Sequence, residues 1–311
     1  MDKTSRDRLQ PQAIVRHGRL DLSARITPGV GANLVSFQVD GTELIHWDEA
    51  GFLSGESFTG AFTMFPTPCR LDNCAYEFEG RRIVQSKGGE KVFIHGLVRD
   101  EAFGFRHEGA RLTSWIDVTP SHPVHEGFPF SCRFGVTHAL EESGLTVSFT
   151  LENRDRRNIP FGYGIHPFWR LHGERRDVRV RVPCDHILDL QNLVPTGGCT
   201  PVQGTPLDLR AGRSLEGFYI DNAFWPRRPG ETAELSLPSI GRRIVFSASD
   251  NFPHMIVYAP EGRPFVCVEN LTTCPNAPNL VSAGHGEMAN MLVAAPGQTV
   301  EGWVRYSIAQ A

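Results

Sequence analysis

The amino-acid sequence predicts an all-β fold, a single-domain sandwich of antiparallel sheets. In many short segments apolar and polar residues alternate, which is the period of a strand with one buried face. The chain contains 31 Gly and 22 Pro, a composition that favours many turns and few helices. No long window has the 3.6-residue apolar spacing of an amphipathic helix. We therefore expect sheets stacked about 10 Å apart around a shared core.

Strand candidates follow one another along the chain. The clearest is Val178–Val182, where valine and arginine alternate without interruption. One short helical turn is expected within residues 206–218. Strands are predicted at residues 33–39, 82–85, 92–94, 111–117, 146–152, 178–182, 243–248, 255–258, 265–269 and 303–308. Turns are predicted between them at Asp40-Gly41, Glu79-Gly80, Gly88-Gly89, Gly197-Gly198 and Pro229-Gly230.

The 311 residues could form two ordinary domains or one large all-β domain. No Ser-rich linker, charge block or internal repeat marks a boundary. Residues 1–311 are therefore predicted to form one domain, with residues 1–12 fraying. Its oligomeric state is expected to be a monomer or a homodimer.

Charge and cysteine content limit the partners. A formal net charge of −4 gives no electrostatic reason to expect nucleic acid. No apolar run approaches the ~20 residues of a membrane span, and the charged N-terminus lacks the apolar core of a secretion signal. The 7 cysteines include no CxxC pair, so neither a disulfide framework nor a zinc site is indicated. We expect a cytoplasmic protein that binds a small molecule, with no nucleic-acid or membrane partner.

Three segments carry side chains suited to acid–base chemistry: His95, His166 and Glu269. Histidine titrates near neutral pH, and burial can raise the pKa of a glutamate toward it. Glu269 ends the apolar run Phe-Val-Cys-Val-Glu, so it is paired, desolvated or at an open strand end. The alternative is a structural glutamate satisfied by a backbone or arginine partner.

The setting of His166 resembles a sugar site. Pro167 keeps His166 extended, and Gly162 and Gly164 permit close approach of a ligand to the backbone. Aromatic residues around it could pack on the C–H faces of a sugar. A satisfied core histidine is the alternative for both His166 and His95. The other ten histidines have loop settings and are expected on the surface, and no HExxH or HxH pair indicates a metal site.

Two further residues could bind a substrate. Arg70 follows a proline-stiffened segment, and its forked guanidinium could hold sugar hydroxyls or clamp Glu269. Asp221, flanked by apolar positions, could accept two hydroxyl hydrogens; a salt bridge or turn cap is the alternative for each. There is no GxGxxG after a strand, no P-loop and no GxSxG, which argues against nucleotide cofactors and serine hydrolysis. No cofactor is predicted.

Taken in order, these segments resemble the aldose 1-epimerase (galactose mutarotase-like) family from about Gly31 to Ile308. Three positions depart from the family pattern: Cys69 stands where Asn is frequent, Phe168 where Tyr is common, and Asn270 where Pro is common. The matching pieces are residues 31–37, Phe65-Pro66 with Arg70, His95-Gly96, residues 160–168, Asp221 in Ile-Asp-Asn-Ala-Phe, residues 267–269 with 275–277, and residues 292–298.

The resemblance implies a single β-supersandwich and an isomerase that interconverts the α and β anomers of a free aldose. It implies that Glu269 is the general base, His166 the general acid and His95 a second histidine beside the ring oxygen. Arg70 and Asp221 would bind substrate. The reaction requires an ionised Glu269 and a protonated His166, and we expect Asp221 to help keep that histidine charged. It requires no metal and no redox cofactor.

Other functions stay open at this level. One is a non-catalytic sugar-binding or sensor domain, since fold does not fix function. Another is a carbohydrate-cleaving enzyme with Asp221 and Glu269 as its two carboxylates. The sugar could be galactose, glucose, a hexose 6-phosphate or a 6-sulfonated sugar. An anionic C6 group would require a second cation, for which the candidates are Arg99, Arg133 and Arg170.

Overall fold

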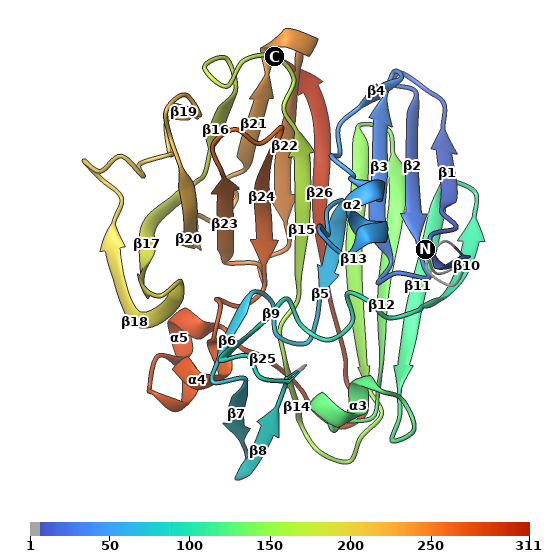
Figure 1. The fold of residues 1–311 in the computed structure, drawn as a ribbon, viewed down its shortest axis with the longest axis vertical. Helices are drawn as coiled ribbons and strands as arrows, with labels where there is room; N and C mark the ends of the chain where they lie inside the picture. Colours follow the sequence, from blue (N-terminus) through green and yellow to red (C-terminus); the bar gives the residue numbers. More distant parts are fainter. Residues whose placement is uncertain (1–6, 87) are drawn as a thin grey trace.

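The computed structural model describes residues 7–86 and 88–311, which form two large antiparallel sheets packed face to face (Figure 1). The predicted all-β sandwich is confirmed. The first sheet has the order β1 (Gln12–Arg16), β2 (Leu22–Thr27), β3 (Asn33–Val39), β5 (Ala61–Met64), β15 (Gly164–Arg170), β24 (Phe265–Leu271), β23 (His254–Ala259), β20 (Ile220–Arg227), β17 (Cys184–Gln191) and β18 (Val194–Pro201), with β4 (Thr42–Glu43) beside β3.

The second sheet covers one face of the first. Its order is β10 (Gly104–Glu108), β11 (Arg111–Val118), β12 (Cys132–Glu141), β13 (Gly144–Asn153), β26 (Thr299–Gln310), β22 (Arg242–Ala248), β21 (Ala233–Leu237), β16 (Arg179–Arg181) and β19 (Arg213–Ser214). Three small pairs complete the strands: β6 (Arg70–Asp72) with β9 (Val92–Ile94), β7 (Ala75–Phe78) with β8 (Arg81–Val84), and β14 (Ile159–Phe161) with β25 (Leu292–Ala294).

The helices are short and lie in connections between strands. They are α2 (Glu49–Ser54), α3 (Val124–Gly127), α4 (Ala277–Ser282), α5 (Gly286–Ala289) and the 3₁₀ helix η1 (Pro238–Ile240). None is long enough to produce a recognisable 3.6-residue pattern, so these helices could not be predicted from apolar spacing. No helix within the described residues is long and apolar enough to cross a membrane.

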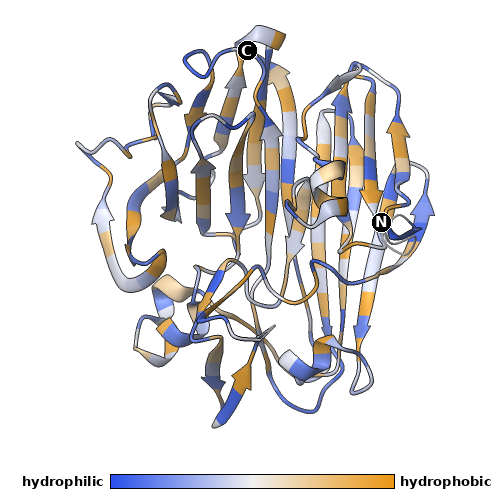
Figure 2. Cartoon of the chain, in the orientation of Figure 1, coloured by the Kyte–Doolittle hydropathy of each residue, from blue (hydrophilic) through white to orange (hydrophobic). Residues whose placement is uncertain are grey.

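The core lies between the two sheets, and aromatic side chains join them. Trp169 of β15 packs edge-to-face on Tyr306 of β26, with ring centroids 4.9 Å apart. Phe65, just after β5, stacks on Phe134 of β12 at 4.1 Å. Figure 2 shows apolar and polar residues alternating along many strands, as the period of two requires.

The central strands of the first sheet are buried on both faces. In β24, Val266 and Val268 belong to the core between the sheets, whereas Phe265 and Cys267 belong to a second apolar cluster on the opposite face. Glu269 continues this second series, because side chains two residues apart point to the same face of a strand. The alternation therefore places Glu269 on the outer face of the sheet, away from the main core.

Most predicted strands are confirmed. Residues 33–39 and 92–94 correspond to β3 and β9, and the other predicted strands coincide with β8, β11, β13, β16, β22, β23, β24 and β26, with ends that differ by a few residues. The helical turn predicted within residues 206–218 is wrong. This segment forms turns and β19, and Gly212 and Gly217 have positive φ angles, which an α-helix excludes.

The expected fraying of residues 1–12 falls partly on residues 1–6, which lie outside the described residues. In the remainder, Arg8 Nε donates a hydrogen bond to the Gly29 carbonyl at 3.2 Å, and Leu9 is buried.

The expectation that the other ten histidines lie on the surface is wrong for His138 and His254. Both are fully buried, in β12 and at the start of β23. His138 lies at an inward position of β12, in the series with Phe134 and Val136, whereas His254 lies on the outer face of the first sheet, in the series with Ile256. The seven cysteines are all free, and Cys199 alone among them is exposed.

Candidate active site

A cleft of about 700 Å³ opens on the outer face of the first sheet. Its floor is formed by five neighbouring strands, β5, β15, β24, β23 and β20. Residues 46–59 and the β6–β9 pair supply further walls. Its lining includes Phe62, His166, Phe168, Glu269, Ile256, Tyr258, Asp221, Arg70 and His95. All five site residues expected from the sequence therefore line one cleft.

Strand register brings His166 and Glu269 together. His166 of β15 pairs with Phe62 of β5, and Glu269 of β24 pairs with Ile256 of β23. Since β15 and β24 are also paired, the two side chains lie in one row across the floor. His166 Nε2 lies 3.3 Å from Glu269 Oε1. This contact joins a potential acid and a potential base that lie far apart in the sequence.

Burial decides the protonation of this pair. It lowers the pKa of His166 to about 3, and the charges of Arg99 and Arg70 act in the same direction. It raises the pKa of Glu269 well above its ordinary value; Asp221 adds to this increase and Arg70 opposes it. Both shifts disfavour the charged forms, so burial favours a neutral pair with its one shared proton on Glu269 over an ion pair.

This result corrects one expectation. Asp221 was expected to keep His166 charged, but its carboxylate acts on Glu269 and is not among the causes that shift the pKa of His166. The imidazole also lies against two aromatic rings, Phe62 and Phe168, each with its centroid 4.7 Å away. Apolar rings solvate an imidazolium less well than water does, so they favour the neutral form.

His95 stands over the floor from the end of β9. Its backbone N–H donates a hydrogen bond to the Cys69 carbonyl at 2.7 Å, and its φ of 67° is in the left-handed region. The imidazole packs edge-to-face against His166, with centroids 5.2 Å apart. Burial, and after it the neighbouring His166, Arg99 and Arg70, holds the pKa of His95 well below its ordinary value.

Arg70 and Asp221 form a loose ion pair at the edge of the floor. Arg70 Nη2 lies 3.9 Å from Asp221 Oδ2, too far for a hydrogen bond. The side chains are 25% and 17% exposed, so donors and acceptors remain accessible from the cleft. Burial raises the pKa of Asp221, and the nearby Arg70 moderates this effect. The salt bridge considered from the sequence thus exists, but it leaves capacity for a ligand.

The three candidates for a second cation differ in their position relative to the cleft. Arg99 lines the cleft, with its guanidinium 4.6 Å above the Phe58 ring. Arg133 lies in the second sheet, where it donates two hydrogen bonds to Asp117. Arg170, at the end of β15, is not among the residues that line the cleft. Arg133 and Arg170 are therefore wrong candidates for a group that faces a ligand.

Several cleft residues were missed by reasoning from the sequence. His46 and Arg263 line the cleft from loops. Tyr219 lines it from the residue before β20, and Tyr258 lines it from within β23. Only Tyr258 carried a usable signal, because it lies in a predicted strand two residues after Ile256. The loop residues have no periodicity that could have placed them.

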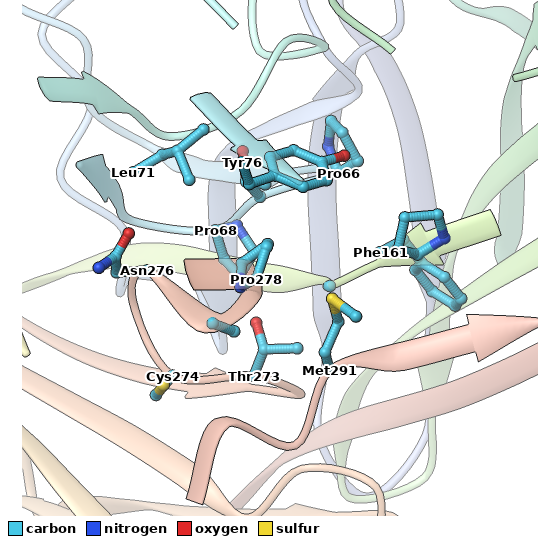
Figure 3. A pocket seen from close by; sticks show the side chains of 14 residues that line it. Pro66, Pro68, Leu71, Tyr76, Phe161, Thr273, Cys274, Asn276, Pro278 and Met291 are labelled. Atoms are coloured by element: carbon cyan, nitrogen blue, oxygen red, sulfur yellow. The ribbon is translucent and has the colours of Figure 1, made fainter. Parts of the chain in front are cut away.

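A second, much smaller cavity shares no lining residue with the cleft. Figure 3 shows the side chains that line this small cavity. Its volume is about 10 Å³, at most the space of one water molecule. Pro66, Pro68 and Tyr76 form part of its wall. It is too small for a sugar. Within the described chain, no group of three or more His, Cys, Asp or Glu residues could hold a metal ion.

Comparison with known proteins gives consistent matches. The family model described as aldose 1-epimerase matches residues 18–307. Human galactose mutarotase is 30% identical over 182 residues, 55% of this chain and 52% of that protein. The Escherichia coli protein YihR is 23% identical over 224 residues, 70% of each chain. The match thus spans about half the length of the human relative.

A solved structure shares the architecture. The galactose mutarotase-like protein from Clostridium acetobutylicum superposes with a TM-score of 0.82 at 17% sequence identity, covering 97% of this chain and 99% of that one. At this identity the likeness concerns the fold alone.

Proposed function

This chain belongs to the aldose 1-epimerase family, and from that premise we propose that it interconverts the α and β anomers of a free aldose by opening and closing the hemiacetal ring. The observation that carries the proposal is the 3.3 Å contact between His166 Nε2 and Glu269 Oε1 on the floor of a cleft large enough for a monosaccharide. A general acid and a general base are the two groups that the reaction needs.

The proton count of the pair fits the reaction. Ring opening requires an ionised Glu269 and a protonated His166, whereas burial favours the neutral pair. Both forms carry one proton, and the direct contact allows it to pass between them. Hydrogen bonds that a bound sugar donates to the carboxylate and accepts from the imidazolium favour the charged form.

In the forward step, Glu269 removes the proton from the C1 hydroxyl while His166 protonates the ring oxygen. The bond from C1 to the ring oxygen breaks, and the C1–O1 bond becomes a carbonyl. Rotation about C1–C2 presents the other carbonyl face. The ring then closes with the proton transfers reversed, which restores the charged pair. After ring opening the pair is neutral, so burial favours this direction of proton transfer.

The remaining residues bind the substrate in this proposal. Asp221 accepts hydrogen bonds from sugar hydroxyls, and Arg70 donates to them. Arg99 and Arg263 add positive charge to the cleft, which supports an aldose with an anionic group at C6 as one substrate class. We further propose that the chain acts as one domain in the cytoplasm, as a monomer or homodimer.

The test is anomeric exchange measured by saturation-transfer NMR. Freshly dissolved α-anomers of glucose, galactose, glucose 6-phosphate and sulfoquinovose are each mixed with the protein. Accelerated exchange of at least one sugar is expected, and the sugar that responds identifies the substrate class. Transfer of saturation to bound sugar without accelerated exchange would instead support a binding or sensor domain. Release of a sugar from a glycoside would support the carbohydrate-cleaving alternative.

A further inference from the structure

The side chain of Met64 contacts a histidine of the cleft. Met64 is fully buried at the end of β5, and its Sδ lies 3.2 Å from His95 Nδ1. A thioether sulfur is a weak acceptor with no proton to donate. The contact is therefore a hydrogen bond only when His95 Nδ1 carries the proton.

The position of the His95 ring is fixed from several sides. The backbone hydrogen bond to Cys69 and the left-handed φ set the direction of the side chain. The ring is packed edge-to-face against both His166 and Phe62, with centroids 5.2 Å away in each case. These contacts fix the centre and plane of the ring, and Nδ1 is the ring nitrogen that lies against Met64. The second ring nitrogen is therefore the one left for a ligand.

Gly164 makes room for this arrangement. It lies directly opposite Met64 in the pairing of β15 with β5. A Cβ atom at Gly164 would lie 2.8 Å from the methyl group of Met64, closer than van der Waals contact allows. The absence of a side chain at Gly164 thus lets the thioether reach His95.

We infer that Met64 is a positioning residue that holds His95 in the tautomer protonated at Nδ1, which leaves an unshared electron pair on Nε2 for the substrate. The low pKa of His95, caused mainly by burial, supports a neutral ring with a single proton. The inference rests on the proposed function and assigns His95 a role in it. His95 accepts a hydrogen bond from a sugar hydroxyl and donates no proton to the ring oxygen.

The tautomer can be observed without any substrate. Long-range ¹H–¹⁵N correlation spectra of protein labelled with ¹⁵N-histidine distinguish a protonated from an unprotonated ring nitrogen. The signals of His95 are identified by their loss in His95→Gln. At neutral pH we expect Nδ1 to be protonated and Nε2 unprotonated. The opposite pattern, or rapid averaging of the two, would overturn the inference.

The part played by Met64 is tested with Met64→Leu, which keeps the volume and removes the sulfur. The His95 signals should shift toward the other tautomer, and KM should rise about threefold to tenfold with little change in kcat, as for loss of one neutral hydrogen bond. Met255→Leu, at another fully buried methionine in β23, should leave both unchanged. An unaltered tautomer in Met64→Leu would show that Met64 does not set it.

A second measurement avoids mutation and changes only the sulfur atom of methionine. Replacing methionine with selenomethionine should move the Nδ1 resonance of His95 if the sulfur accepts its proton, and an unmoved resonance counts against the contact. Failure of the proposed function looks different: the spectra would show the expected tautomer while no sugar undergoes accelerated anomeric exchange.

Discussion

Arg70 and Asp221 face each other at 3.9 Å and shift the pKa of Glu269 in opposite directions. Asp221 raises it through like-charge repulsion, and Arg70 lowers it by stabilising the carboxylate. The two side chains come from different parts of the fold, Arg70 from the small β6–β9 pair and Asp221 from the floor strand β20. The proton affinity of the buried carboxyl is therefore adjusted by two elements that can be altered separately.

The first prediction concerns pH. The proposed cycle needs one proton on the His166–Glu269 pair, so kcat/KM should fall at alkaline pH once Glu269 loses that proton. Asp221→Asn removes a charge that raises the pKa of Glu269, so the alkaline limb should move to lower pH. Arg70→Gln removes a charge that lowers this pKa, so the limb should move to higher pH. Anomerisation rates across pH, corrected for the uncatalysed reaction, give both positions.

Both variants are expected to turn over more slowly, because the proposal assigns both residues to substrate binding. The pH at which the rate falls does not depend on the maximal rate, so it can still be compared. Exposed Glu301→Gln in the second sheet should leave the profile unchanged. Shifts of Asp221→Asn and Arg70→Gln in the same direction would contradict the assignment of the alkaline limb to Glu269.

The second prediction separates chemistry from binding. Glu269→Gln should abolish measurable anomer exchange while sugar binding, followed by saturation transfer, remains. His166→Asn should lower kcat by about 10²–10⁴, the usual contribution of an acid–base group. Wild-type turnover in Glu269→Gln would refute the base assignment. A loss below about tenfold in His166→Asn would mean that this histidine is structural.

The third prediction concerns stability in acid and tests His138, far from the cleft in β12. Burial lowers the pKa of His138 to about 3, whereas an unfolded histidine titrates near 6.5. Between these values the unfolded chain holds one more proton at this residue than the folded protein. The free energy of unfolding should therefore fall by about 1.4 kcal/mol per pH unit of acidification from this residue alone.

His138→Leu removes this contribution and should reduce the slope by that amount, measured by urea unfolding between about pH 6 and 4. Exposed His107→Leu in β10 is the matched control and should leave the slope as it is. An unchanged slope in His138→Leu would show that His138 gains its proton in the folded protein.

The fourth prediction concerns substrate charge. Arg99→Gln and Arg263→Gln should reduce kcat/KM for an anionic sugar more than for its neutral counterpart, because a charged hydrogen bond is worth about 1.5–3 kcal/mol. Arg133→Gln, whose guanidinium binds Asp117 in the second sheet, should affect neither. Equal losses with both sugars would mean that these arginines do not meet a charged group.

The sequence was sufficient for the fold class, and the five residues it singled out line one cleft. Period-two alternation is a local property, so it located strands such as β3 and β9, and resemblance to a family ordered the site residues along the chain. The protonation of the site could not be predicted in this way. The pKa shifts of His166 and Glu269 depend on burial, which is a property of the packed structure.

The wrong expectations for Arg133 and His138 also have a cause in long-range structure. Nothing in the local sequence distinguishes Arg133 from Arg99. Arg133 nevertheless lies in the second sheet and Arg99 beside Phe58 in the cleft, because the order of strands in a sheet depends on contacts between distant residues. His138 was expected on the surface because a loop setting was inferred for it, and polar residues are usually exposed in loops. Its strand position overrides that preference, at the cost of an imidazole whose two nitrogens have no partner in the structure.

The position of the cleft on the outer face of the first sheet has a consequence for how such a protein can diversify. His166 and Glu269 belong to central strands that are enclosed on both sides, so insertions or exchanges there would disrupt the whole sandwich. Arg99, His46 and Arg263 belong to connections at the rim, where changes are tolerated more easily. Under the proposed function, a lineage could therefore acquire a new sugar preference by altering rim loops while keeping the His166–Glu269 pair unchanged.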